Sequence, residues 1–354
     1  MGAGRTNADQ VKQQAQARAA QGVPQRVYQG QQIKAGTFLN PSMDVRYGGR
    51  RVSRLPQDLV GKKKLLPISI LFDVSGSNSR VAAKTHNDLP QFWGLTEYLL
   101  PPELYHLNLQ FGAITDWLHE EKSVQLSQFE SNGALVDRWL TDLYPVGGGY
   151  SNRVEGYDFA MWLLGHMNDI ELWQTGEKAV AFILFDEGFE SALDVRHMHE
   201  IFNSATAPID DKTEGLSVNM RQLSTSTMQL PALGSKITTQ EIVADLKTKY
   251  NLFGVHCSES DNYGHDFSEQ KFVEWSALLG AESVFRLTDS ANISELVASV
   301  TARVLGVGRN KILNAVSAGN TLIGSGLSEI TNALDLVSPV GSSSIVPNDK
   351  IKRL

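Results

Sequence analysis

Three apolar runs that each end in an acidic residue constrain the fold of this chain more than any other feature. Runs that are apolar at nearly every position are typical of strands in a parallel sheet that is covered on both faces. Open parallel sheets bind ligands just beyond the carboxyl ends of their strands, so the acids that follow these runs are candidate site residues. The runs are residues 65–72, followed by Asp73; residues 107–114, followed by Thr115 and Asp116; and residues 178–185, followed by Asp186 and Glu187.

Segments with apolar residues at helical spacing separate these runs, for example residues 89–99 and 157–167. A fourth strand at 253–257, a short strand at 283–287 and a closing helix at 293–305 continue the alternation. Alternation of strand and helix predicts an α/β fold with a doubly wound, mostly parallel central sheet and helices on both faces. We expect extended N- and C-terminal tails to flank it.

Composition divides the chain into four parts. The first is rich in Gln, Ala, Gly and Arg and is expected to be a disordered or partner-dependent basic arm. A lead-in with Gly, Pro and Arg follows, and then the predicted domain, which contains a long Ser- and Thr-rich surface insertion. The parts are residues 1–35 (arm), 36–64 (lead-in), 65–308 (domain, with the insertion at 203–237) and 309–354 (a tail rich in Gly, Ser and Ala).

The overall composition is that of a soluble globular protein, with 42% hydrophobic and 20% charged residues. No run of eighteen or more uninterrupted apolar residues occurs, so no membrane span is expected. The polar N-terminus has no apolar stretch of the kind that signal peptides contain. A single cysteine, Cys257, cannot form an internal disulfide and fits a reducing compartment, so the expected location is the cytoplasm.

The net charge of −7 hides an asymmetry along the chain. Residues 1–64 contain 12 Lys and Arg against 3 Asp and Glu, or +9, and the remainder contains 20 against 36, or −16. A basic arm on an acidic body could bind nucleic acid or an acidic partner. Tyr28, Phe38 and Tyr47 are the few aromatic residues among the early basic residues, so nucleic acid is not the expected partner. An arm that lies on its own acidic domain, or is simply solvated, explains the asymmetry more plainly.

The turn after the first apolar run carries the spacing D-x-S-x-S. Asp73, Ser75 and Ser77 place one carboxylate and two hydroxyls on a tight loop, where all three can face one point. Hard oxygen donors of this kind suit Mg²⁺, Mn²⁺ or Ca²⁺. Few formal charges would leave the ion electrophilic, with an open position for an outside ligand. The sequence therefore predicts a divalent-cation site at the end of the first strand.

These features resemble the von Willebrand factor A (vWA) domain and its metal-ion-dependent adhesion site, over residues 65–305. The D-x-S-x-S turn looks like the family's first metal loop, and residues 111–116 (FGAITD) are similar to its second strand. Asp186, in F-D-E-G, stands where many vWA domains have T-D-G, so the resemblance makes it the acid of the third loop. Gly147–Gly149 followed by Glu155 and Tyr157 is similar to a bacterial and phage vWA subgroup of largely unassigned role.

One departure concerns the second metal loop. Most metal-binding vWA domains supply a threonine there, whereas this chain has Tyr150, Ser151 and Asn152 after the glycines. Ser151 or Asn152 could take that place, directly or through water. Glu155 either serves instead or is an acid of the first helical turn that the helix dipole favours. For Asp116, a turn-capping role is favoured over a place near the cation.

The resemblance implies a protein-binding adaptor or scaffold, not an enzyme, that captures an acidic group of a partner protein through a bridging cation. By family analogy one partner type is a MoxR-like AAA+ ATPase. No nucleophile elbow, H-E-x-x-H or Walker A motif occurs in the sequence. Two alternatives remain open: a metal-dependent hydrolase that uses the same acids, and a structural component of a phage or contractile assembly.

Overall fold

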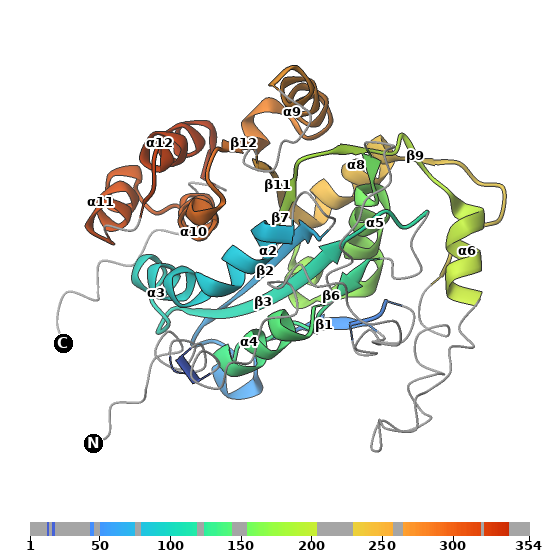
Figure 1. Cartoon of the computed structure of the whole chain (residues 1–354). Helices are drawn as coiled ribbons and strands as arrows, with labels where there is room; N and C mark the ends of the chain where they lie inside the picture. Colours follow the sequence, from blue (N-terminus) through green and yellow to red (C-terminus); the bar gives the residue numbers. More distant parts are fainter. Residues whose placement is uncertain are drawn as a thin grey trace.

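The structure is a computed structural model, and it describes residues 13, 16–17, 43–45, 50–74, 79–118, 124–143, 154–203, 229–257, 265–319 and 322–339. Of residues 79, 80, 82, 83, 203, 265 and 266 it describes the backbone alone. The described residues form a mixed α/β fold around a six-stranded, mostly parallel sheet. Figure 1 shows the helices that surround the strands of this sheet. No helix in this part of the chain is both long enough and apolar enough to cross a membrane.

The central sheet has the order β12-β11-β7-β2-β3-β4. Neighbouring strands are parallel except for the edge strand β4, which is antiparallel to β3. The predicted strands are confirmed, because near-continuous apolar runs form strands that are buried along nearly their whole length. The strands are β2 (Lys64–Asp73), β3 (Tyr105–Ile114), β4 (Gln125–Leu126), β7 (Ala179–Phe185), β11 (Tyr250–Cys257) and β12 (Val284–Leu287).

Helices and short strands connect and cover this sheet. The helices are α2 (Ser79–Asn87), α3 (Leu89–Leu99), α4 (Gly133–Asp142), α5 (Tyr157–Met167), α6 (Val195–Asn203), α8 (Thr239–Lys249), α9 (His265–Leu279), α10 (Ile293–Val304), α11 (Arg309–Gly319) and α12 (Gly326–Leu336). The short strands are β1 (Arg51–Ser53), β5 (Val154–Glu155), β6 (Asn168–Ile170), β8 (Gly188–Phe189), β9 (Ala192–Leu193) and β10 (Ile237–Thr238).

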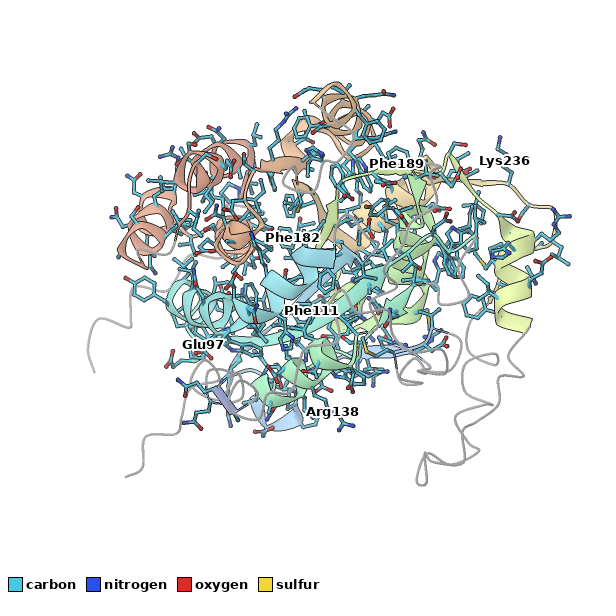
Figure 2. All side chains as sticks on the ribbon, viewed as in Figure 1. Glu97, Phe111, Arg138, Phe182, Phe189 and Lys236 are labelled. Atoms are coloured by element: carbon cyan, nitrogen blue, oxygen red, sulfur yellow. The ribbon has the colours of Figure 1, made fainter. Side chains whose placement is uncertain are left out.

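Alternation along the strands divides the core between the two faces of the sheet. Ile70 and Phe72 of β2 pack in one apolar cluster with residues of α3, α4 and α10, and Leu71 packs in a second with residues of α5 and α8. Phe111 of β3 and Phe182 of β7, both labelled in Figure 2, belong to the first cluster. Helices therefore supply apolar side chains to both faces of the sheet.

Residues before 65 belong to the fold. Asp44 forms an isolated bridge with Gln125 of β4, and the amide of Leu126 donates to the main-chain oxygen of Met43 at 2.9 Å. A few residues later β1 pairs in parallel with β6. The stretch predicted as a lead-in (36–64) therefore contributes a strand and buried side chains, and the folded unit begins before residue 65.

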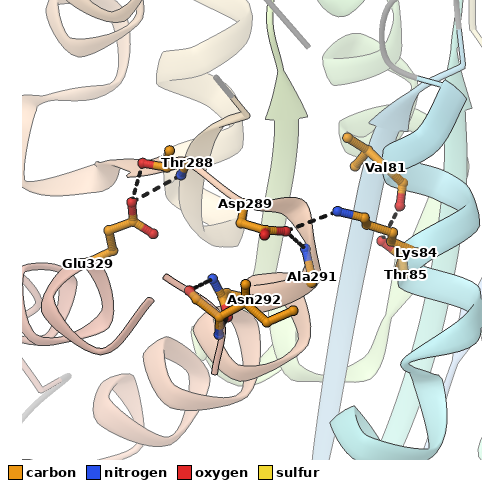
Figure 3. Close-up of polar contacts among 9 residues, drawn as sticks. Val81, Lys84, Thr85, Thr288, Asp289, Ala291, Asn292 and Glu329 are labelled. Carbon is orange, nitrogen blue, oxygen red and sulfur yellow. Dashed lines mark hydrogen bonds and ion pairs between the residues drawn. The ribbon is translucent and has the colours of Figure 1, made fainter. Parts of the chain in front are cut away.

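The predicted tail of residues 309–354 is wrong for its first part. Two helices, α11 (Arg309–Gly319) and α12 (Gly326–Leu336), lie in this stretch, and Ile312, Ile330 and Leu334 are fully buried in the first core cluster. Figure 3 shows that Glu329 of α12 accepts a hydrogen bond from the amide of Thr288, just after β12, at 3.1 Å. The abundance of Ser, Gly, Ala and Asn suggested a tail, but a few apolar residues at helical spacing suffice to bury one face of each helix.

Other predicted segments fall largely outside the described residues. Of the basic arm (1–35) the structure describes only residues 13, 16 and 17, and residues 340–354 lie outside it. Residues 204–228 of the predicted insertion are outside as well. At its ends, α6 closes at Asn203, and β10 pairs antiparallel with β9.

Candidate functional site

The order of the strands creates a switch point at the centre of the sheet. From β2 the chain moves outward to β3 and β4, and then crosses to the other side of β2 to form β7, β11 and β12. At such a point the segments that leave two neighbouring strands diverge, and open α/β sheets bind ligands in the crevice between them. Here the switch point lies between β2, which ends at Asp73, and β7, which Asp186 directly follows.

Half of the predicted metal ligands lie within the described part of the chain. Asp73, Glu155 and Asp186 are buried, with exposed fractions of 0%, 3% and 3%. The charges of Asp73 and Asp186 both act on Glu155, so the fold brings the three predicted acids together. The other three predicted ligands, Ser75, Ser77 and Ser151, lie outside the described residues.

Glu155 reaches this edge of the sheet through a short strand. Strand β5 pairs in parallel with β8, and Glu155 lies opposite Phe189. Because β8 starts two residues after Asp186, the pairing carries Glu155 to the carboxyl end of β7. The alternative that Glu155 is an acid of the first helical turn is wrong, because α5 begins at Tyr157 and its first-turn acid is Asp158.

Gly156 permits a close approach between the start of α5 and the end of β3. Its amide donates to the main-chain oxygen of Thr115 at 3.1 Å. A Cβ atom at this position would lie 2.5 Å from that oxygen and 2.7 Å from Cδ1 of Trp117. Only glycine fits there without displacing a neighbour. The order Glu155-Gly156-Tyr157 therefore places an acid and an aromatic ring on either side of a backbone contact.

Two more acids share the same edge. Asp116 and Glu187 are 4% and 5% exposed, and both charges act on Glu155. The turn role predicted for Asp116 is confirmed, since its Oδ1 accepts a hydrogen bond from the amide of Leu118 at 3.2 Å. The same carboxyl group also contributes to the acidic cluster, a role that the sequence analysis did not favour. These five buried acids form the acidic cluster: Asp73, Asp116, Glu155, Asp186 and Glu187.

The electrostatics of the acidic cluster centre on Glu155. Burial, and after it the charges of Asp73, Glu187, Asp116 and Asp186, raise the pKa of Glu155 to about 11. Without a cation, Glu155 therefore keeps its proton at neutral pH. Its Oε2 atom is buried and has no hydrogen-bond partner among the residues that the structure describes. A bound cation would favour the charged form of every member of the cluster.

The donors of the acidic cluster fit a divalent cation of the hard kind. Carboxylate oxygens are the ligands that Mg²⁺, Mn²⁺ and Ca²⁺ prefer. Within the described residues, no three acidic, His or Cys side chains are placed to hold one metal ion. Hydroxyl and water ligands beside these carboxylates would complete the coordination of such an ion. When bound, the ion would supply a positive centre for an anionic group.

Tyr157 contacts the cluster from inside the protein, and the sequence analysis missed it. Its hydroxyl donates to Oδ2 of Asp73 at 3.3 Å, and its ring meets that of Trp275 edge-on at 5.1 Å between centroids. Trp275 in turn donates from Nε1 to the main-chain oxygen of Glu187 at 3.0 Å. Both aromatic residues lie in helices and are fully buried, as is typical of core packing. The signal that could have identified Tyr157 is its place after Glu155 and Gly156.

Helix α2 begins directly after the D-x-S-x-S turn, and an ion pair fixes its far end. Figure 3 shows Nζ of Lys84 at 3.0 Å from Oδ1 of Asp289, which also accepts a hydrogen bond from the amide of Ala291 at 2.8 Å. The hydroxyl of Thr85 donates to the main-chain oxygen of Val81 within the helix. The helix after the predicted metal loop is therefore held against the loop that follows β12.

Two histidines in α6, His197 and His199, are spaced as H-x-H, but each has its own structural partner. Nε2 of His197 lies 2.9 Å from the main-chain oxygen of Trp117, and Nε2 of His199 lies 2.7 Å from that of Pro231. Two residues apart on a helix, these side chains point in different directions and do not converge on a common ligand. They take no part in the acidic cluster.

No family model matches this sequence, and no curated protein matches it. Two crystal structures of the pilus adhesin SpaC from Lactobacillus rhamnosus GG match with a TM-score of 0.43 each, at 10% and 11% identity, over 68% of this chain and 31% of the adhesin. Proximal thread matrix protein 1 from the mussel byssus matches with a TM-score of 0.39 and 9% identity, over 78% of this chain and 72% of that protein.

This chain thus spans about a third of the length of the adhesin that it matches. Likenesses this low identify neither a family nor a function.

Proposed function

We propose that the protein is a divalent-cation-dependent protein-binding module of the vWA type rather than an enzyme. In this proposal Asp73, Ser75 and Ser77 hold Mg²⁺, or Mn²⁺ or Ca²⁺, and Asp186 is the acid of the third loop. Ser151 or Glu155 supplies the remaining ligand. A carboxylate of a partner protein completes the coordination of the ion, so binding requires the metal.

The observation that carries this proposal is the convergence of the acidic cluster on the switch point between β2 and β7. Five carboxyl groups from four segments of the chain lie there, and each is at most 5% exposed. Burial of like charges costs free energy unless a counter-charge binds or a group takes up a proton. A fold that retains this arrangement at its ligand-binding edge is most simply explained by a cation.

The doubly wound arrangement is part of the same proposal. The strand order, written from β4 to β12, follows the 3-2-1-4-5-6 pattern of doubly wound sheets. Apolar helical residues on both faces of the sheet support it as well. Together with the D-x-S-x-S turn, these features favour a vWA-like domain with a metal-ion-dependent adhesion site.

The proposed partner is a protein that presents an exposed Asp or Glu side chain. A MoxR-like AAA+ ATPase is one such partner by family analogy. We propose the cytoplasm as the location, since Cys257 is buried and is the chain's single cysteine. Binding of a partner carboxylate through the metal requires neither a general base nor a nucleophile. This agrees with the absence of a hydrolase motif from the sequence.

Calorimetric titration of the full chain with Mg²⁺ and with Mn²⁺ tests the site directly. We expect saturable binding to the wild type and loss of about 100-fold or more in affinity for Asp73→Ala, because a ligand is removed. Asp335→Ala is the matched control, since this carboxylate is exposed on α12 and pairs with Arg309. A fluorescent peptide containing glutamate should then bind to the wild type with Mg²⁺ and not with EDTA.

Several outcomes would overturn this function. Absence of cation binding by the wild type would remove the site, and equal peptide binding with Mg²⁺ and EDTA would remove the bridging role. Hydrolysis of a phosphoester that needs Mg²⁺ and is lost in Asp73→Ala would instead favour the metal-dependent hydrolase. Large assemblies of the pure chain in light scattering, formed equally with and without metal, would favour the structural component.

A further inference from the structure

We infer that Tyr157 is a positioning residue of this site, which holds the carboxylate of Asp73 in the orientation that the cation requires. The inference rests on the proposed function, because it concerns the same ion. It goes further by assigning a role to a side chain that is not itself a ligand. The hydroxyl of Tyr157 donates to Oδ2 of Asp73 at 3.3 Å, and both residues have an exposed fraction of 0%.

The position of Tyr157 is fixed by rigid neighbours. Its ring is perpendicular to that of Trp275, at 87°, with 5.1 Å between centroids. Trp275 is fully buried and stacks on Phe185, the last residue of β7, at 4.3 Å. Aromatic pairs in these geometries restrict each other's rotation. The hydroxyl of Tyr157 is therefore held in one place by packing, independently of Asp73.

The same packing reaches the second acidic strand end. Nε1 of Trp275 donates to the main-chain oxygen of Glu187 at 3.0 Å. Tyr157 and Trp275 thus form a buried bridge between Asp73 at the end of β2 and Glu187 after β7. This bridge therefore contacts both of the strand ends between which the ion is proposed to bind. Groups that orient metal ligands from behind commonly contribute 10- to 100-fold to metal affinity.

The direction of the hydrogen bond follows from the chemistry of the two groups. The phenol of tyrosine has a proton to donate, whereas an ionised carboxylate can only accept. At 3.3 Å the contact is long for such a pair, and its contribution comes from orientation more than from bond strength. Removal of the hydroxyl should therefore loosen the geometry without unfolding the site.

Tyr157→Phe tests this inference, because it keeps the ring against Trp275 and deletes only the hydroxyl. Tyr250→Phe is the matched control: that tyrosine is also buried, but its hydroxyl accepts from Asn168 at 2.8 Å and lies at the start of β11, the opposite end of the sheet. Mg²⁺ and Ca²⁺ affinities are measured by calorimetry on the full chain, and thermal unfolding is measured with EDTA present.

For Tyr157→Phe we expect Mg²⁺ affinity to fall about tenfold and Ca²⁺ affinity to fall less, because Mg²⁺ demands near-ideal octahedral geometry and Ca²⁺ tolerates irregular ligands. A simple packing defect would lower the affinities for Mg²⁺ and Ca²⁺ equally, and it would lower the melting temperature that is measured with EDTA present. That result would overturn the inference. Unchanged Mg²⁺ affinity would overturn it too. Tyr250→Phe should bind both ions as the wild type does.

A second readout does not depend on the variant being well folded. Mg²⁺ added to the wild type and to Tyr250→Phe should change the near-ultraviolet tyrosine difference spectrum, because the environment of the Tyr157 hydroxyl changes with the charge of Asp73. No such change in either protein, despite cation binding, would contradict the role of Tyr157. If the wild type binds no cation at all, the proposed function itself fails, so the two failures are distinguishable.

Discussion

The guanidinium group of Arg51 donates two hydrogen bonds to the main-chain oxygen of Leu126, from Nε at 3.2 Å and from Nη2 at 3.0 Å. Arg51 has an exposed fraction of 0%, and Leu126 belongs to the edge strand β4. Burial lowers the pKa of Arg51 to about 10, and the charge of Asp44 opposes this shift. Arg51 therefore stays charged at neutral pH and ties the N-terminal part of the fold to the edge of the sheet.

Arg51→Met should destabilise the protein, because the oxygen of Leu126 loses both donors while it remains buried. We expect the free energy of unfolding to fall by about 2 to 4 kcal/mol in urea denaturation. Arg54→Ala is the matched control. That side chain is 61% exposed and pairs with Asp169, so its loss should cost less than about 1 kcal/mol. Equal losses for the two variants would show that Arg51 has no special role.

A truncation after residue 308 should fail to fold, in contrast to the full chain. The shorter chain loses α11 and α12 and with them Ile312, Ile330 and Leu334 from the core. Burial of three such side chains stabilises the fold by about 4 to 8 kcal/mol, which is comparable to the total stability of many domains. Thermal unfolding and size-exclusion chromatography compare the two chains. A cooperative transition at the wild-type temperature in the shorter chain would refute this.

Asp158→Asn should make stability less sensitive to pH. Burial, and to a smaller extent the charge of Glu190, raise the pKa of Asp158 to about 8 from its ordinary value of 3.8. Between these two pH values the folded state holds a proton that the unfolded state has lost, so stability falls as pH rises.

The variant has no such proton to lose. Its stability relative to the wild type should therefore increase from about pH 4 to about pH 8, by at least about 1 kcal/mol. Urea denaturation with EDTA present, at pH values across this window, measures the difference. A difference that stays constant with pH would show that Asp158 is charged in the folded protein.

Gly156→Ala should disturb the acidic cluster through sterics alone. The new methyl group would lie within 2.7 Å of the Thr115 oxygen and of Trp117, so the start of α5 must shift. We expect a loss of about 1 to 3 kcal/mol in the free energy of unfolding, together with weaker cation binding. Gly308→Ala is the control, because nothing lies within 4 Å of a Cβ atom there. Equal stability of the two variants would contradict the close approach.

The sheet could be predicted from the sequence because its strands are buried on both faces. Each of the runs 65–72, 107–114 and 178–185 lies inside or within one residue of a strand of the structure. The two-residue strands β4 and β5 could not be predicted, because their pairing depends on neighbours far away in the chain. Periodicity carries no signal over two residues.

Of the candidate site, too, only some residues could be predicted from the sequence. Asp73 and Asp186 could be located because they follow strands that the pattern predicts, and parallel strands end at a common edge. Glu155 was identified only as a choice between two roles, and the pairing of β5 with β8 decides against the helical one. Tyr157 could not be assigned, since a tyrosine on an apolar helical face looks the same whether or not its hydroxyl meets a carboxylate.

The contacts of Arg51 also have a consequence for the order in which the protein folds. Arg51 pairs with Asn168 in the β1–β6 ladder and binds the oxygen of Leu126, and both partners are synthesised long after it. Both contacts are distant in sequence, so Arg51 can reach its native place only once β4 and β6 have been made. Until then the β4 edge remains open to other chains.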